Sequence, residues 1–190
     1  MSRERRREVI ERAALELFAD RGYAGASMDE LARRSGVSAP VLYDHFDSKR
    51  DLHQRLLERT RGELLAMWRE SLAGDDPAAV RIPRSIEAWA HYVEANPYAA
   101  RMYFRETTSD PEVRTVHRRI QREAERELGA ILGGELNAEP VALEMAAVTM
   151  RSALTGLAIW WADHPDVTRE QIVATALAVV WTGLERTLTV

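Results

Sequence analysis

Residues 38–49, with the sequence SAPVLYDHFDSK, carry small side chains first and an aromatic and basic cluster last. Three side chains near the end can donate a hydrogen bond to an anionic oxygen, namely Tyr43, His45 and Lys49. Three near the start have no hydrogen-bonding group, namely Ala39, Pro40 and Val41. A helix with this order can place its first turn against base edges, including thymine methyl groups, while later residues hold phosphates. The pattern therefore predicts contact with a DNA groove.

Two short helices are needed to position this segment, and the neighbouring residues contain the signals for them. Ser27 followed by Glu30 forms the capping box that opens a first helix. Gly36 ends that helix, because glycine adopts the left-handed conformation of a C-cap without strain. Ser38 caps the second helix, and Pro40 falls in its first turn, where a missing N–H costs no hydrogen bond. A glycine-containing turn between two helices is typical of the helix-turn-helix motif.

Basic residues flank the predicted motif on both sides. Lys49, the only lysine of the chain, falls at the start of the next helix, where its ammonium and the free N–H groups can face a phosphate. An arginine-rich segment at residues 3–7 either follows the DNA backbone and minor groove or is a solvated helix end. The candidate DNA-contacting residues are Ser27, Ser38, Ala39, Pro40, Val41, Tyr43, Asp44, His45 and Lys49, together with Arg3 and Arg5.

A longer set of residues, from Val9 to His53, has the order and spacing of one known family. Its members are Ile10, Ala13-Ala14, Leu17-Phe18, Gly22-Tyr23, Ser27-Met28-Asp29, Leu31-Ala32, Gly36-Val37-Ser38, Leu42-Tyr43, His45-Phe46, Ser48-Lys49 and Leu52. This set resembles the N-terminal domain of the tetracycline-repressor (TetR) family of bacterial transcriptional regulators. The resemblance implies an all-α fold, in which an N-terminal three-helix DNA-binding domain precedes a C-terminal helical bundle. It also implies backbone contacts for Tyr43, His45 and Lys49, whereas Ala39-Pro40 departs from the family pattern.

The composition excludes several classes of protein. The 190 residues carry a net charge of −4 and no cysteine, so disulfides and thiolate metal sites are excluded. No run of about 18 apolar residues occurs, and the charged start lacks the apolar core of a secretory signal. We therefore expect no membrane span and a cytoplasmic location. The five histidines lack metal-ligand spacing, and neither a phosphate-binding glycine loop nor a nucleophile motif is present. We expect no enzyme and no cofactor.

Glycine and proline divide the chain into about nine predicted helices, and no segment alternates as a strand would. Apart from the helix-turn-helix pair, their expected ranges are about 3–21, 49–73, 83–95, 97–107, 111–133, 139–163 and 168–190. We expect a DNA-binding domain at residues 1–52 and a ligand-binding and dimerisation domain at residues 53–190.

The last two predicted helices are apolar on more than one side, so both need cover on more than one side. A partner molecule is the simplest source of the second packing surface. The TetR resemblance implies a two-fold dimer in which these helices from each subunit form a four-helix bundle. The candidate interface residues are Leu143, Val173, Leu177, Val180, Trp181, Leu184 and Leu188. A dimer also suits a palindromic DNA site, because two modules one helical turn apart contact both halves.

Aromatic and methionine side chains are concentrated between the fourth and the eighth predicted helix. Any one of them could simply pack in the core, but together they fit the family's small-molecule pocket, an apolar cavity with few polar anchors. The candidate ligand-binding residues are Trp68, Trp89, Tyr92, Met102, Tyr103, Met150, Leu154 and Trp160. Few charged residues accompany them, which favours an apolar or amphipathic ligand.

The sequence therefore predicts a homodimeric DNA-binding regulator, a repressor that a small ligand releases from a palindromic operator. Its expected partners are double-stranded DNA, that effector and a second copy of the chain. Two other classes stay open, both without DNA binding: a helical protein-interaction module and an all-α enzyme.

Overall fold

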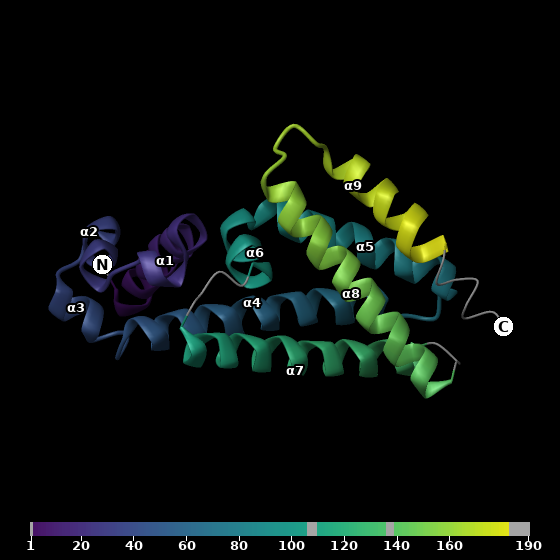
Figure 1. The fold of residues 1–190 in the computed structure, drawn as a ribbon, viewed down its shortest axis with the longest axis horizontal. Coiled ribbons are helices and arrows are strands. Elements are labelled where there is room, and N and C mark those ends of the chain that lie inside the picture. The colour runs from purple at the N-terminus through teal and green to yellow at the C-terminus, as the bar shows by residue number, and fades with distance from the viewer. Residues whose placement is uncertain (1, 106–109, 136–138, 183–190) are drawn as a thin grey trace. The chain divides into compact units, whose positions relative to one another are not determined.

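The computed structural model describes residues 2–105, 110–135 and 139–182, without the side chains of Leu132, Gly134, Glu135, Pro140, Ala142 and Leu143. Over these residues the chain forms nine α-helices and one short π-helical segment, and no strand (Figure 1). The all-α prediction is confirmed. The elements are α1 Arg3–Gly25, α2 Met28–Ser35, α3 Ala39–Tyr43, α4 Lys49–Leu72, α5 Ala78–Ala95, α6 Pro97–Phe104, α7 Pro111–Glu135, α8 Pro140–Ala162, α9 Arg169–Ala176 and η1 Leu177–Trp181.

Two compact units divide the chain. The first comprises Met1–Thr60 and Tyr98–Ile120, and the second Arg61–Pro97 and Gln121–Val190. The first unit therefore adds α6 and the start of α7 to the helices of the DNA-binding motif. The functional boundary expected between residues 52 and 53 stays a prediction.

The core of the first unit follows the apolar periodicity of its helices. Ile10, Ala14 and Leu17 recur on one face of α1 and are fully buried. Leu42 of α3 and Phe46 just after it complete this core, at 0% and 1% exposure. The recognition helix is therefore anchored by its inner side, which leaves its outer side for another molecule.

Glycine and a cap define the helix-turn-helix geometry. Gly36 has φ 67° and ψ 27°, the left-handed conformation that its position after α2 predicts. The Glu30 amide donates to Ser27 Oγ at 3.2 Å, which confirms half of the expected capping box. The Glu30 carboxylate instead accepts bonds from Arg21 at 2.8 Å and Arg34 at 3.2 Å, and so links α2 to α1.

The expected cap by the Ser38 side chain is wrong. Ser38 precedes α3 in an extended conformation, but its hydroxyl makes no capping hydrogen bond. Pro40 occupies the second helical position and has no N–H to donate, which removes one of the two usual partners of an N-cap side chain. The Ser38 side chain is therefore exposed at the entrance to the recognition helix.

The second unit is built from the remainder of α4 and α7 together with α5, α8, α9 and η1. Trp89 and Ile86 of α5 are 1% and 0% exposed, and Leu72 of α4 is 2% exposed. The predicted start of α5 at residue 83 is wrong, because the helix begins at Ala78 and contains Pro83. Proline so near a helix start removes a single hydrogen bond, and buried Ile82 holds the first turns in place.

The ninth helix begins as expected but changes its winding. Thr168 and Gln171 form a complete capping box, as the sequence predicts. From Leu177 to Trp181 the backbone is π-helical, and the expected continuation towards Val190 lies outside the described residues. No helix in the described part of the chain is both long and apolar enough to span a bilayer.

Candidate nucleic-acid interface

The recognition helix α3 and the residues beside it present both polar and apolar side chains on their outer side. Four of the predicted contact residues are exposed, namely Ser38, Pro40, Tyr43 and Asp44, and three are half-buried, namely Ala39, Val41 and His45. Tyr43 is 51% exposed, a large value for an aromatic side chain next to a folded core. Such exposure fits a residue that contacts another molecule, as the sequence predicts for Tyr43.

The arginine-rich start of α1 reaches the end of the recognition helix. The Arg3 guanidinium donates to the backbone carbonyl of Asp44 at 3.5 Å, across 41 positions of the chain. Burial lowers the pKa of His45, and the positive charges of Arg3 and Arg6 lower it further. The lowered pKa favours the neutral form of His45, so the positive charge beside α3 comes from the arginines.

Lys49 has partners inside the first unit. Its ammonium donates to the carbonyl oxygens of Tyr23 at 2.9 Å and Ala26 at 2.8 Å. It also lies 4.3 Å from the centre of the Tyr23 ring, and burial lowers its pKa. Two of its three N–H donors are thus used between the end of α1 and the start of α4. The phosphate contact expected for Lys49 stays a prediction, and its first role in this structure is to position these helices.

The helix that follows the motif is capped as expected. The Asp51 amide donates to Ser48 Oγ at 3.1 Å, while the Asp51 carboxylate accepts from the Asp47 amide at 3.2 Å.

Ser27, also a predicted contact, is exposed but uses its hydroxyl to cap α2. Arg5 is exposed and pairs with Glu8 at 3.1 Å.

Arg33 was not among the predicted contacts, although it lies in the helix-turn-helix motif. Its side chain, on α2, is 75% exposed and makes only a long contact of 3.5 Å to Glu30. The arginine pair Arg33-Arg34 just before the turn is the sequence signal that points to it. Arg34 differs, because Glu30 holds it and only 28% of its side chain is exposed.

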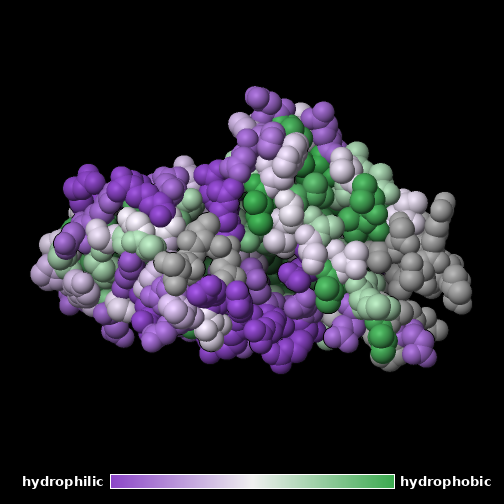
Figure 2. Space-filling view, viewed as in Figure 1, coloured by the Kyte–Doolittle hydropathy of each residue, from purple (hydrophilic) through white to green (hydrophobic). Residues whose placement is uncertain are grey.

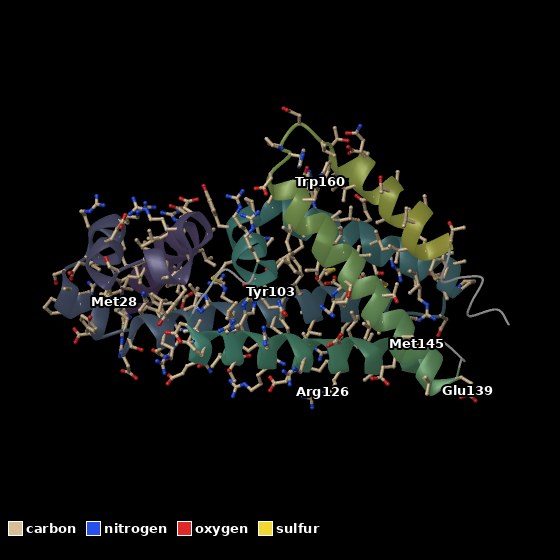
Figure 3. All side chains as sticks on the ribbon, viewed as in Figure 1. Met28, Tyr103, Arg126, Glu139, Met145 and Trp160 are labelled. Carbon is tan, nitrogen blue, oxygen red and sulfur yellow. The ribbon has the colours of Figure 1, made fainter. Side chains whose placement is uncertain are left out.

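The predicted ligand-binding residues divide between the two units. Met102 and Tyr103 belong to α6 of the first unit, where both are 5% exposed, and Figure 3 labels Tyr103 on this helix. Four of the others are buried in the second unit, namely Trp68, Trp89, Met150 and Leu154. Tyr92 donates its hydroxyl to Glu63 at 2.8 Å. Trp160 is 46% exposed and stacks on His164, with ring centres 3.9 Å apart, so it lies on the surface.

The predicted dimer residues differ in how far they are exposed. Val173 and Val180 are 8% and 5% exposed, so they pack within their own subunit and offer little surface to a partner. Leu177 and Trp181 are half-buried. Leu184 and Leu188 lie outside the described residues, as does the side chain of Leu143.

The exposed apolar surface of the second unit lies mainly along α8. Its large side chains are Val141, Met145, Val148 and Trp160, at 64%, 60%, 39% and 46% exposure, and Val179 of η1 adds 72%. Figure 2 shows hydrophobic residues at intervals along this helix, and Figure 3 shows Met145 and Trp160 near its opposite ends. The second unit therefore has an exposed apolar surface, on α8 more than on the segment that follows α9, and the pairing of two subunits through it stays a prediction.

Known proteins share both the motif and the fold. Residues 10–56 match the family described as bacterial regulatory proteins, tetR family. The HTH-type transcriptional activator FasR of Mycolicibacterium smegmatis is 29% identical over 186 residues, which are 97% of this chain and 85% of FasR. The fatty acid degradation regulator FadR of Bacillus halodurans has a TM-score of 0.78 at 18% identity, with 94% of each chain covered. FadR of Bacillus subtilis in complex with stearoyl-CoA has a TM-score of 0.74 at 19% identity, covering 95% of this chain and 97% of that one.

These matches agree with the residues on which the interface is built. The family match covers most of α1, the helix-turn-helix pair and the start of α4, and the FasR alignment continues through both units. A helical fold with an exposed recognition helix beside a row of arginines is suited to bind DNA. Residues 10–56 form a DNA-binding domain of the tetR family of bacterial regulatory proteins, and the chain is a DNA-binding transcriptional regulator.

Proposed function

We propose that the protein represses transcription by binding a palindromic operator as a homodimer, and that a small apolar or amphipathic ligand releases it. The observation that supports DNA binding most directly is the Arg3–Asp44 contact. It puts the positive charge of the α1 start beside the exposed side chains of α3, so one surface offers both phosphate contacts and groove contacts.

The apolar surface of α8 supports the homodimer. Four large apolar side chains that are 39% to 64% exposed on one helix form a patch that water disfavours. Val148, Ser152 and Gly156 follow one another at four-residue spacing, and the two small residues allow a second helix to approach closely. A two-fold axis through this surface would bring the same patch from each subunit together and give two recognition helices.

Buried aromatic side chains support the effector. Trp68 and Trp89 supply large apolar areas inside the second unit, and Met150 can adapt to an irregular ligand. The structural relative FadR of Bacillus subtilis binds stearoyl-CoA, an amphipathic molecule with a long apolar chain. We therefore propose a fatty acyl chain as the apolar part of the effector. It must bind the DNA-free conformation more tightly, because otherwise it cannot lower DNA occupancy.

Activation is the second candidate, and one observation favours it. FasR, which is 29% identical over nearly the whole chain, is an activator. A DNA-bound dimer can activate or repress depending on where its operator lies relative to the promoter. Transcription in vitro from the operator's own promoter, with and without the protein, distinguishes the two: a lower transcript yield supports repression, and a higher yield supports activation.

The experiment that tests the proposal starts with a pool of random DNA duplexes. Repeated selection by the purified protein should enrich two inverted half-sites about one helical turn apart, or a multiple of that distance. Stearoyl-CoA added to the complex should then release the DNA, whereas coenzyme A without an acyl chain should not. Enrichment of a single half-site would contradict the dimeric operator, and no enrichment at all would contradict the proposed DNA recognition.

A further inference from the structure

The second unit contains an open groove of about 550 Å³ between α7 and α8. Pockets that bind small molecules have volumes of about 300–1,000 Å³, so this groove is large enough for one. On the α7 side its lining residues follow one another at helical spacing and share one face of the helix, namely Arg122, Arg126, Gly129 and Gly133. That face therefore has two basic side chains at one end and two positions without a side chain at the other.

Arg122 and Arg126 are the positive groups of this groove, and Figure 3 labels Arg126 on α7. Both are exposed, and among the described residues neither guanidinium makes a hydrogen bond or an ion pair. Like charges four positions apart on a helix repel each other. An anion that both guanidinium groups contact would remove this repulsion and gain charged hydrogen bonds.

Two carboxylates also line the groove, and they differ in their surroundings. Glu125 of α7 accepts from Arg151 of α8 at 2.8 Å, so its charge is balanced and the pair joins the two walls. Glu144 is exposed near the start of α8. Since α8 follows a few residues after the end of α7, and residue 151 meets residue 125, Glu144 lies nearer to the glycine end than to the arginines. It can accept a hydrogen bond from a hydroxyl or amino group there.

The glycine end of the groove offers open space and apolar surface. A Cβ atom at Gly129 would meet no atom within 4 Å, so a flat group can lie directly against α7 at this position. Ala147 and Val148 of α8 face the same groove, at 3% and 39% exposure. Val148 also belongs to the apolar surface of α8 described above, so the groove lies at the edge of that surface.

We propose that this groove binds a nucleoside diphosphate group, either as a free nucleotide or as the head of a coenzyme A ester. The phosphates would pair with Arg122 and Arg126, the uncharged base would lie over Gly129, and Glu144 would accept from a hydroxyl or amino group. Residues 122–133 span about 16 Å along α7, which is long enough for such a group. The proposal does not rest on the operator or on an acyl chain, because it can be tested without either.

The test measures the binding of ADP to the purified protein by calorimetry at constant ionic strength. We expect one ADP per chain, with adenosine and inorganic pyrophosphate each binding about tenfold more weakly or less, since each makes only part of the contacts. Coenzyme A identifies the source: binding at least as tight as that of ADP indicates a coenzyme A ester, and weaker binding indicates a free nucleotide.

Two arginine variants locate the site. Arg126→Gln should weaken ADP binding by about tenfold or more, because it removes a charged donor to phosphate. It should leave the melting temperature unchanged, since the side chain is exposed and without a partner among the described residues. Arg12→Gln, which removes the same charge from an exposed position of α1, is the matched control and should bind ADP like the wild-type protein.

A second pair of variants fills space and keeps every charge. Gly129→Leu should abolish ADP binding, whereas Gly62→Leu, at an exposed position of α4 where a Cβ also meets no atom within 4 Å, should not. If Gly129→Leu fails to fold, Arg126→Gln still decides. Equal ADP binding by wild type, Arg126→Gln and Arg12→Gln would overturn the proposal and indicate nucleotide binding elsewhere. It would also be overturned if ADP does not bind, or if pyrophosphate binds as tightly as ADP.

Discussion

The ammonium of Lys49 lies 2.9 Å from the carbonyl oxygen of Tyr23 and 4.3 Å from the centre of its ring. A second bond, of 2.8 Å, joins the same ammonium to the Ala26 carbonyl. One side chain at the start of α4 thus satisfies two backbone acceptors at the end of α1, those of Tyr23 and of the capping residue Ala26. Because α2 and α3 follow directly, Lys49 contributes to the position of the recognition helix.

Replacement of Lys49 by alanine should lower the free energy of unfolding by about 2 kcal/mol, since charged hydrogen bonds to two carbonyls and a cation–π contact are lost. Arg12→Ala, at an exposed position of α1, should leave it nearly unchanged. Urea unfolding of the two variants measures this. A Lys49→Ala protein with wild-type stability but no DNA binding would show that the lysine acts on phosphate and not on the fold.

His53 should make stability depend on pH. Burial, then the charges of His117 and Lys49, lower its pKa from 6.5 to about 4. Below pH 6.5 the unfolded chain takes up a proton that the folded protein takes up only near pH 4. The contribution of His53 to the free energy of unfolding is therefore fully present above pH 6.5. It is lost as the pH is lowered towards 4, and the loss is about 3 kcal/mol in total.

The measurement for His53 is the free energy of unfolding between pH 7.5 and pH 4 at constant ionic strength. Other carboxylates and histidines also titrate, so the informative quantity is the difference between wild type and His53→Phe. The variant keeps an aromatic ring against Phe18 and Tyr23 and removes the titrating group. Its stability should fall less steeply with decreasing pH, and parallel curves would contradict the assignment.

The apolar surface of α8 should hold two subunits together. Val148→Glu introduces a charge that stays hydrated in the monomer, where the residue is 39% exposed, but loses water at a dimer interface. We expect sedimentation to show folded monomers. Val80→Glu is the matched control, because Val80 is 51% exposed on α5 and should tolerate the change as a dimer. A Val148→Glu dimer of wild-type affinity would place the interface elsewhere.

The arginines at the start of α1 should appear in the salt dependence of DNA binding. Each phosphate contact contributes about 0.9 to the slope of the logarithm of the binding constant against the logarithm of salt concentration. Replacing Arg3 and Arg5 by glutamine should therefore lower the slope by up to about 2. Arg69→Gln, in the second unit, should not change it. An unchanged slope for the double variant would mean that these arginines belong to a solvated helix end.

Local rules predict the first unit well. The apolar period of Ile10, Ala14 and Leu17 identifies the buried face of α1, and only glycine suits the left-handed position of Gly36. These features depend on neighbouring residues alone. For that reason the helix-turn-helix and its exposed outer residues can be derived from the sequence.

Packing choices in the second unit cannot be derived in this way. When a helix is apolar on several sides, its sequence does not show which side packs within the subunit and which side a partner would contact. Val173 and Val180 were therefore expected at an interface, although they are buried within their own subunit. Lys49 shows the same limit, because its partners at Tyr23 and Ala26 lie more than 20 positions earlier in the chain. The start of α5 was missed because Pro83 normally marks a helix start but lies inside this one.

The central claim is that the outer side of α3 contacts DNA, and two exposed tyrosines test it most directly. Tyr43 of α3 and Tyr98 of α6 are 51% and 44% exposed, so replacing either by alanine should change the melting temperature little. In a gel-shift titration with the selected operator, Tyr43→Ala should weaken binding by about tenfold or more, equivalent to at least about 1.4 kcal/mol. Tyr98→Ala should bind like the wild-type protein. Equal affinity of the two variants would contradict the assignment of α3 as the DNA-contacting surface.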